Sequence, residues 1–424
     1  MSLLPALQRE MGLNIIVVGA GIGGLCSAVA LQQAGHNVKV FEKSEFNREV
    51  GAALLLAPNA ERVLLSLGFD FQRARADEMN CWEVLDGVTL QALSKTDFSD
   101  SREKYGASLH SIHRADLHQE LLHLASRPAG PESSGRLSLH LASRVVSAHW
   151  DGYVDLEDGT RHHADLVVAA DGLHSVIRSV VTGDQRQDGM CATPSGMSAF
   201  RFLIPTDLLK NNPHFQSLRK IKGPGSTIFA DTKHVTERHM VWYDCQQGQV
   251  QNFVGVRTTS EAGDHDLKAL MRSEFEDFHP SLLQLIQVAP KVTDWPLYIY
   301  DPLPVWSKGK IILVGDAAHP MLPFGGQGAN QAIEDAGALG ALFAGVSSPS
   351  LVSERLKLFE DVRRLRASRV QILSKARLGK EKEVEAELMQ YADPPGANVP
   401  TSIHERYEHD FAFDVLERCR EVLA

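Results

Sequence analysis

A glycine-rich segment near the N-terminus decides how the chain begins to fold. It follows Ile15–Val18, a short apolar run rich in β-branched residues, which predicts a strand buried on both faces. The next glycines, Gly19, Gly21 and Gly24, have the spacing G-x-G-x-x-G. The first permits a tight turn, the second lets the backbone approach a pyrophosphate, and the third lets the next helix pack on the strand.

A complete nucleotide-binding unit surrounds these glycines. Residues 25–34 predict the helix after the turn, and Gly35 is suited to end it in the left-handed conformation. Residues 38–41 predict a second strand. Glu42 ends this strand, at the position where a carboxylate is expected to bind a ribose hydroxyl. A loop that merely needs glycines does not explain Glu42, so the segment predicts a dinucleotide site.

The composition excludes several classes of protein. The chain has 424 residues, enough for two or three domains, and its formal net charge of -10 argues against a nucleic-acid surface. Its five cysteines are an odd number without C-x-x-C spacing, which favours a reduced, cytoplasmic protein over a disulfide framework or a metal site. Because no apolar run reaches the roughly 20 residues that cross a bilayer, we expect no stable membrane insertion.

The order of the predicted elements divides the chain. Strands and helices alternate in residues 1–185, strand patterns dominate residues 186–295, and the alternation returns in residues 296–376. Residues 377–424 predict a helical tail. We therefore expect an α/β fold: a Rossmann-like dinucleotide-binding domain, an inserted and mainly antiparallel β-sheet domain for substrate, and a helical C-terminal region.

Three segments in the same order resemble those of flavin-dependent aromatic hydroxylases. Besides the glycine-rich unit, they are residues 165–178, DLVVAADGLHSVIR, and residues 315–335, GDAAHPMLPFGGQGANQAIED. These are similar to the D-G and G-D-A-A-H-x-x-x-P-x-x-G-Q-G segments of that family. Trp295 and Phe359–Arg363 flank the last segment as in the salicylate-hydroxylase-like branch. The chain is identified as a member of the class A flavoprotein monooxygenases, of this branch and of the fungal type.

The resemblance implies a fold, a cofactor and an activity. The fold is that of p-hydroxybenzoate hydroxylase, with FAD held non-covalently. NAD(P)H reduces the flavin, O2 adds at flavin C4a, and the resulting hydroperoxide hydroxylates or oxidatively dearomatises a phenol or another electron-rich aromatic. The lack of a second G-x-G-x-x-G fits a family that reduces its flavin from a transient NAD(P)H site. We expect no metal, and a monomer or homodimer.

The residues expected to bind FAD are spread over the motifs. Asp316 follows a buried strand and can reach a ribityl or phosphate-linked hydroxyl. Gly326 and Gly328 leave N–H groups bare near a helix start, where they can hold the negative charge of a reduced flavin. Arg114 resembles the family's FAD-contacting arginine and suits a pyrophosphate. The full expected set is Gly19, Gly21, Gly24, Glu42, Lys43, Ala53, Arg114, Val145, Asp171, Asp316, Gly326, Gly328, Ala329 and Asn330.

Some of these polar residues have structural alternatives. Asp316 is alternatively an acid that closes a turn, and Arg114 a surface residue at a helix start. Asp171 either faces the place where flavin and nicotinamide meet or closes a turn. We expect His319 and the pair Glu334–Asp335 to be structural rather than catalytic.

Two residues of the second domain are the catalytic candidates. Strand alternation places Arg201 on the face opposite its two phenylalanine neighbours, and Tyr243 opposite Trp242. Similar Arg and Tyr positions contact substrate in fungal phenol-dearomatising relatives. The resemblance implies that Arg201 stabilises a phenolate and Tyr243 orients it; the alternative is a solvent-facing Arg and a core Tyr. Phe324 replaces a histidine of some bacterial salicylate hydroxylases, which argues against salicylate itself.

Other functions share this fold. One is an epoxidase or indole oxidase of secondary metabolism, because the flavin half is common to both. Another is a flavin oxidoreductase that transfers no oxygen. A non-enzymatic, GDI-like or scaffold protein predicts eroded glycines, and the glycines here are intact.

Overall fold

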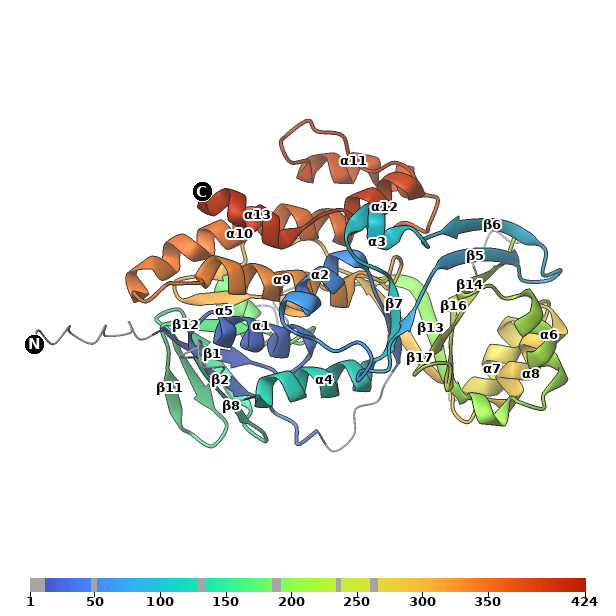
Figure 1. The fold of residues 1–424 in the computed structure, drawn as a ribbon, viewed down its shortest axis with the longest axis horizontal. Helices are drawn as coiled ribbons and strands as arrows, with labels where there is room; N and C mark the ends of the chain where they lie inside the picture. The colour runs from blue at the N-terminus through green and yellow to red at the C-terminus, as the bar shows by residue number, and fades with distance from the viewer. Residues whose placement is uncertain (1–11, 47–51, 128–134, 185–191, 234–237, 260–265) are drawn as a thin grey trace, which may run out of the picture.

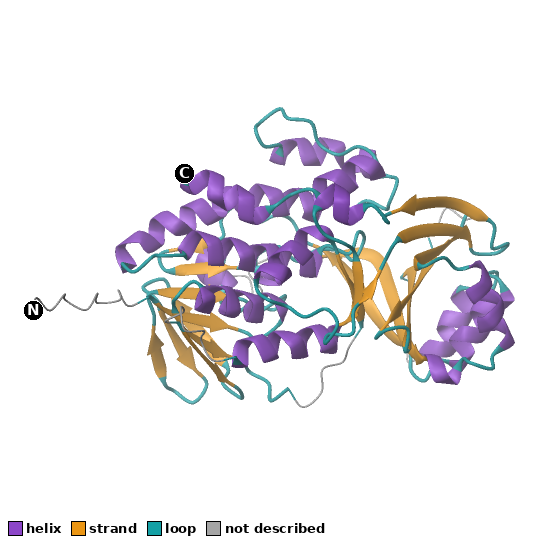
Figure 2. Ribbon diagram, viewed as in Figure 1, coloured by secondary structure: helices purple, strands orange, loops and turns teal. Residues whose placement is uncertain are grey.

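The computed structural model describes residues 12–46, 52–127, 135–184, 192–233, 238–259 and 266–424. Two sheets organise these residues, one at each end of an elongated molecule (Figure 1). Helices cover the first sheet, and a separate group of helices packs on the outer face of the second (Figure 2). No helix in these six ranges is long and apolar enough to span a membrane.

The first sheet, called the parallel sheet here, carries the glycine-rich unit. Its order is β18-β19-β12-β1-β2-β8, with every pair parallel except β18 and β19. Its strands are β1 (Asn14–Val18), β2 (Asn37–Phe41), β8 (Arg136–His140), β12 (Leu166–Ala169), β18 (Ser307–Lys308) and β19 (Ile311–Leu313). The last four residues of β1 and all of β12 and β19 are buried, as expected of strands covered on both faces.

Helices pack on the parallel sheet and complete its core. They are α1 (Ile22–Gln33), α2 (Pro58–Ser66), α4 (Arg114–Ser126), α5 (Arg178–Thr182) and α9 (Gly328–Phe343). The helix α1 follows the glycines as predicted, and it packs between α4 and α9. Gly35 has φ +99° and ends the turn after α1, which confirms its left-handed conformation. The predicted hairpin forms between β9 (Val145–His149) and β10 (Tyr153–Leu156), and β11 (Arg161–His163) extends it.

The second sheet, called the antiparallel sheet here, has one parallel pair, β5 with β14. Its order is β17-β13-β16-β15-β14-β5-β6. The strands are β5 (Cys81–Asp86), β6 (Ala92–Asp97), β13 (Thr193–Pro205), β14 (Gly225–Ala230), β15 (His239–Cys245), β16 (Val250–Thr258) and β17 (Thr293–Ile299). The helices α6 (Pro213–Ile221), α7 (Leu267–Glu274) and α8 (Pro280–Val288) cover its outer face.

This sheet is larger than the sequence predicts. Its mainly antiparallel character is confirmed, but it is not confined to residues 186–295, because β5 and β6 come from residues 81–97. A small sheet of β3 (Ala53–Leu56), β7 (His110–His113) and β4 (Asp77–Glu78) lies between the two large ones, followed in the chain by α4. The domain boundaries at 185, 295 and 376 stay predictions.

The C-terminal region packs into the body of the protein. It contains α10 (Val352–Leu373), α11 (Glu385–Leu388), α12 (Ile403–Phe411) and α13 (Val415–Leu423). The helix α13 packs on α9 and places the fully buried Cys419 in the core of the parallel sheet. Phe411 of α12 packs against Trp82 at the start of β5. The last helices therefore contact both halves of the fold.

Candidate active site

A cavity of about 1220 Å³ lies between the parallel and antiparallel sheets. One side of its lining includes Gly21 and Gly23 of the glycine-rich turn, and the other includes Arg201 and Tyr243 of the antiparallel sheet. This volume exceeds the roughly 300–1,000 Å³ of a typical small-molecule site. The cavity can thus hold a large cofactor and a second small molecule together.

The three glycines of the first motif have distinct physical roles. Gly19 has φ +97°, and a Cβ there would lie 2.5 Å from the carbonyl oxygen of Ala170. A Cβ on Gly24 would lie 1.9 Å from the carbonyl oxygen of Gly19, so only glycine lets α1 pack on β1. A Cβ on Gly21, by contrast, would have no atom within 4 Å. Space is therefore open at Gly21, where the chain enters α1.

The open space at Gly21 fits a phosphate group. Gly21 is the N-cap of α1, and no side chain caps this helix start. The first N–H groups of a helix lack partners within the helix and carry partial positive charge, which favours an anion. The same holds for α9, whose first residues, Gly328 and Ala329, also line the cavity. Two helix N-termini therefore face one cavity, and either can bind an anionic group of a dinucleotide.

Glu42 is buried and already supports the glycine-rich loop. One carboxylate oxygen accepts the N–H of Ala20 at 2.8 Å, and the other accepts the N–H of Ser44 at 2.8 Å. A carboxylate has about four acceptor sites, so it can still accept a ribose hydroxyl. The structure thus adds a loop-holding role to the predicted cofactor contact.

Replacing Glu42 with alanine should weaken FAD binding by about 1.5–3 kcal/mol, because a ribose hydroxyl loses a charged acceptor. The dissociation constant is measured by titrating FAD into the apoprotein. Glu42→Gln is the matched variant, because its amide oxygen can still accept the N–H of Ala20. If Glu42→Ala lowers the melting temperature of the apoprotein but leaves the dissociation constant unchanged, Glu42 is structural only.

Asp316 and Arg114 face the same cavity. Asp316 lies in a 3-10 turn, Gly315–Ala317, directly after β19, and its side chain is exposed into the cavity. Its deep position raises the pKa of its carboxyl, although the charges of His319 and Arg114 act in the opposite direction. Arg114 begins α4 and lines the cavity with an exposed side chain. Asp316 is suited to accept a hydrogen bond from a hydroxyl group, and Arg114 is suited to bind a phosphate.

Seven predicted cofactor residues do not line the cavity: Gly19, Gly24, Glu42, Lys43, Val145, Asp171 and Asn330. The carboxylate of Asp171 accepts the N–H groups of Val176 and Ile177, at 2.8 and 3.3 Å, which is the turn-closing alternative. Lys43 is exposed, and Val145 is buried at the start of β9. Their predicted contacts with the cofactor stay predictions.

Asn330 uses its side chain to hold two loops. Its amide oxygen accepts the N–H of Ala57 at 2.8 Å, and its amide nitrogen donates to the carbonyls of Leu55 and Gly326, at 3.0 and 2.7 Å. The backbone N–H of Asn330, in the first turn of α9, is the group that remains for a cofactor.

The antiparallel sheet presents Arg201 to the cavity as predicted. Phe200 and Phe202 are buried against the helices of the outer face, and Arg201 points from the inner face. Its Nε is buried without a hydrogen-bond partner among the described residues. Burial lowers the pKa of the guanidinium; Tyr243 opposes this and Arg114 adds to it. Arg201 is thus a half-buried cation with unmet hydrogen-bonding capacity.

Tyr243 lines the same face but is partly committed elsewhere. Its hydroxyl donates to the carbonyl oxygen of Ala53 at 2.9 Å, which ties β15 to β3. Burial raises the pKa of this hydroxyl, so its proton stays in place. Ala53, one of the residues predicted to bind the cofactor, therefore lies beside Tyr243. The tyrosine can still accept a hydrogen bond from a ligand.

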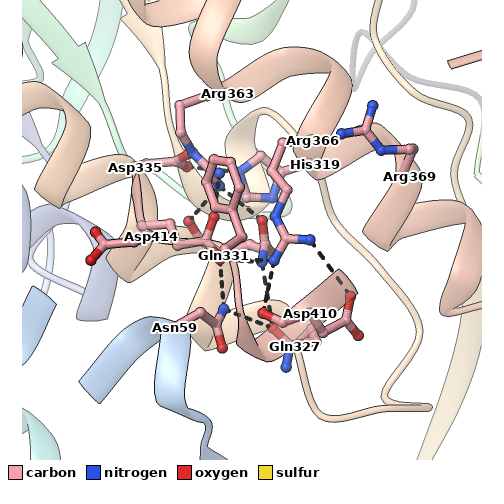
Figure 3. Close-up of polar contacts among 12 residues, drawn as sticks. Asn59, His319, Gln327, Gln331, Asp335, Arg363, Arg366, Arg369, Asp410 and Asp414 are labelled. Atoms are coloured by element: carbon pink, nitrogen blue, oxygen red, sulfur yellow. Dashed lines mark hydrogen bonds and ion pairs between the residues drawn. The ribbon is translucent and has the colours of Figure 1, made fainter. Parts of the chain in front are cut away.

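Glu334 and Asp335 are fully buried in an ionic network. Figure 3 shows Asp335 with Arg363 and His319 of this network. Arg363 donates to both carboxylates, with Nε 2.9 Å from Asp335. Arg366 lies 3.2 Å from Glu334, and His319 lies 2.7 Å from Asp335. Burial raises the pKa of both carboxyls, but interactions with neighbouring side chains, above all Arg366 for Glu334 and His319 for Asp335, hold each pKa below its usual range. The network is structural, as expected.

Two arginines that the sequence did not single out hold the loops around the cavity. Arg178 is fully buried and donates to the carbonyls of Ala317 and Asp316, at 2.7 and 2.8 Å. Arg406 of α12 donates to the carbonyl of Phe324 at 2.7 Å. A Cβ on Gly325 would lie 2.2 Å from the Nη2 of Arg406. The D-G segment, which ends at Arg178, could have pointed to the role of this arginine, whereas no sequence motif surrounds Arg406.

No group of three or more potential ligands among the described residues can hold a metal ion. The site instead has two helix N-termini, open space at Gly21 and a cavity with room for a large cofactor. The FAD-binding domain family matches residues 13–373. The chain belongs to this family.

Relatives make the class more specific. The chain is 34% identical to the FAD-dependent monooxygenase cfoG of Aspergillus candidus, over 98% of this chain and 96% of that protein. It is 32% identical to hispidin-3-hydroxylase of Neonothopanus nambi, over 84% of this chain and 86% of that protein. A solved salicylate hydroxylase substrate complex superposes with a TM-score of 0.72 at 25% identity, covering 97% of this chain and 98% of that one.

The chain is therefore an FAD-dependent monooxygenase of the class A flavoprotein family, with relatives in fungal secondary metabolism. The predicted family, the fold and the FAD cofactor are confirmed, and NAD(P)H is the co-substrate typical of this family. Because its relatives are enzymes, the non-enzymatic alternative is rejected.

Heat denaturation should release the FAD into solution, because we expect it to be bound non-covalently. The described lining of the cavity contains no cysteine, and its histidine, His239, lies on the antiparallel sheet. The check is to precipitate the yellow protein by heat and measure flavin absorbance in the supernatant. Flavin that stays with the precipitate would show a covalent link.

Proposed function

We propose that the chain uses NAD(P)H and O2 to hydroxylate, or oxidatively dearomatise, a phenol or another electron-rich aromatic. The observation that carries this proposal is Arg201, a half-buried guanidinium on the cavity face with an unpaired Nε among the described residues. A phenolate is the partner that such a group favours. The name of the relative hispidin-3-hydroxylase supports an aromatic substrate.

In this proposal Arg201 holds the phenol oxygen and stabilises its anion. A fixed positive charge within hydrogen-bonding distance lowers the pKa of a phenol, and the phenolate ring is the better nucleophile toward an electrophilic oxygen. Arginine supplies this field at every working pH, because it stays protonated. Tyr243 braces the site through Ala53 and accepts a hydrogen bond from the substrate.

The residues that would hold FAD lie at the other side of the cavity. The N-terminus of α1 at Gly21 and the side chain of Arg114 suit the pyrophosphate, Glu42 the ribose, and Asp316 the ribityl chain. When bound, FAD supplies the redox chemistry, namely acceptance of a hydride and activation of O2.

We also propose the conditions in which the enzyme works. The described cysteines Cys26, Cys81, Cys245 and Cys419 are free and buried, which suits a reducing, cytoplasmic location. We keep the monomer or homodimer as the expected state.

A substrate panel tests the proposed function. The FAD-loaded enzyme is supplied with NADPH or NADH and a set of phenols, indoles and alkenes, and oxygenated product, NAD(P)H oxidation and hydrogen peroxide are measured. We expect coupled product formation with phenols. Coupled turnover of indoles or alkenes alone would establish the indole oxidase or epoxidase instead. NAD(P)H oxidation without oxygenated product across the panel would contradict oxygen transfer to these compounds.

A further inference from the structure

Several buried N–H groups of the described residues have no hydrogen-bond partner, and three of them belong to residues that line the cavity. They are Nε of Arg201, Nδ2 of Asn252 and Nε1 of Trp82. Proteins rarely leave such donors unpaired, so each requires an explanation. All three are donors, which indicates that the missing partner is rich in acceptors.

The side-chain amide of Asn252 has no hydrogen-bond partner for its Nδ2 among the described residues. The residue lies in the middle of β16 and is 1% exposed. Its cross-strand neighbours are Leu203 of β13 and Tyr243 of β15. Leu203 is apolar, and the hydroxyl of Tyr243, which donates to Ala53, makes no hydrogen bond with Nδ2 of Asn252. Since neither neighbour pairs with this amide nitrogen, a molecule in the cavity is the candidate partner.

Asn252 is close enough to Arg201 for both to hold one small molecule. Arg201 is paired with Val254, two positions along β16 from Asn252. The two residues are therefore diagonal neighbours on the inner face, and such side chains start about 7–8 Å apart. Both side chains point into the cavity, and the long arginine side chain can approach the asparagine.

We infer that Asn252 determines substrate specificity by donating a hydrogen bond to a second oxygen on the ring whose phenol oxygen Arg201 holds. This inference rests on the proposed function and makes its substrate class narrower. The substrate is an aromatic with at least two oxygen substituents, one a phenol and the other a carbonyl or hydroxyl acceptor. A simple indole offers a donor and no oxygen acceptor, and would leave Asn252 unpaired.

The test compares ligands that differ in one acceptor. The probes are the three hydroxyacetophenone isomers and the three ethylphenols, in which a CH2 replaces the carbonyl. Binding to the FAD-loaded enzyme is followed by the change in flavin absorbance. For at least one isomer, the wild type should bind the carbonyl compound about tenfold more tightly than its ethylphenol, because one buried hydrogen bond is satisfied.

Substitutions of Asn252 test whether its side-chain amide causes the difference in affinity between the two kinds of probe. Asn252→Leu should lose about a tenfold part of this difference and keep only the preference of Arg201 for the more acidic phenol of the hydroxyacetophenone. Asn252→Asp should disfavour the carbonyl compound, because a carboxylate cannot donate. Gln287→Leu, at an exposed position of α8, is the matched control and should keep the wild-type difference. FAD content and melting temperature establish folding; if Asn252→Leu fails to fold, Asn252→Asp decides.

The outcomes separate this inference from the proposed function. A preference for the carbonyl compound that is as large in Asn252→Leu or Asn252→Asp as in the wild type overturns the role of Asn252. Equal binding of both probe classes to the wild type also overturns it, while phenol hydroxylation would still support the proposed function. Turnover of indoles with no phenol turned over would overturn the phenol-holding role of Arg201, and the absence of oxygenated product from every aromatic would overturn the proposed function itself.

Discussion

Replacing Arg201 with alanine should abolish product formation while FAD content and melting temperature stay near those of the wild type. Removing a group that stabilises developing or bound negative charge commonly costs about 10²–10³-fold in kcat. Arg201 makes no ion pair with the described residues, and its Nε has no hydrogen-bond partner there. The measurements are product formed per NAD(P)H oxidised, bound FAD and thermal unfolding.

Graded variants sharpen this test. Arg201→Lys keeps the charge but loses the planar fork, so it should retain some turnover. Tyr243→Phe should lose less rate and instead release more hydrogen peroxide or alter regiochemistry, since it loosens the contact with Ala53. Arg272→Ala, at an exposed position of α7, is the control. If Arg201→Ala and Tyr243→Phe both make normal product at normal coupling, the anchor for the substrate lies elsewhere.

Replacing Arg363 with alanine should reduce the free energy of unfolding by about 3–5 kcal/mol. Arg363 is fully buried and donates to Glu334 and to Asp335, so its loss leaves two buried carboxylates short of a cation. Asp335 also accepts the N–H of Gly315 at 2.9 Å, at the edge of the cavity. The variant should therefore bind FAD more weakly as well as unfold at lower urea concentration.

A surface ion pair provides the comparison. Arg418 and Glu421 are exposed and 2.8 Å apart in α13, and such pairs contribute about 0–1 kcal/mol. Arg418→Ala should thus unfold almost as the wild type does. Equal stability of Arg363→Ala and the wild type would show that Glu334 and Asp335 find other partners or take up protons.

Local patterns were sufficient to predict the cofactor half of the fold. The unit from β1 through α1 to β2 is encoded in consecutive residues. Its Gly19 and Gly24 lie so close to neighbouring backbone atoms that a Cβ at either position would clash with them. Strand alternation likewise placed Arg201 on the cavity face. Each of these inferences needs only neighbours in the sequence.

Long-range pairing is what the sequence did not reveal. The parallel pair of β5 and β14 joins Trp82 to Ser226, and no local pattern specifies a partner so distant. The unpaired amide of Asn252 likewise became visible only when its neighbours Leu203 and Tyr243 were known. The hydrogen bonds that Glu42 accepts from backbone N–H groups could not be predicted either, because a glutamate in the sequence does not indicate which N–H groups it will meet.

The contact of Arg406 in α12 with the loop at Phe324 and Gly325 has a consequence for the folding of the chain during its synthesis. The ribosome makes Phe324 and Gly325 long before it reaches Arg406, the side chain that fills the space beside them. The glycine-rich turn and α1 can thus form while the chain is still being translated. The wall of the cavity at Phe324 cannot acquire its buried arginine until α12 has left the ribosome, so the cofactor site is completed in two stages separated in time.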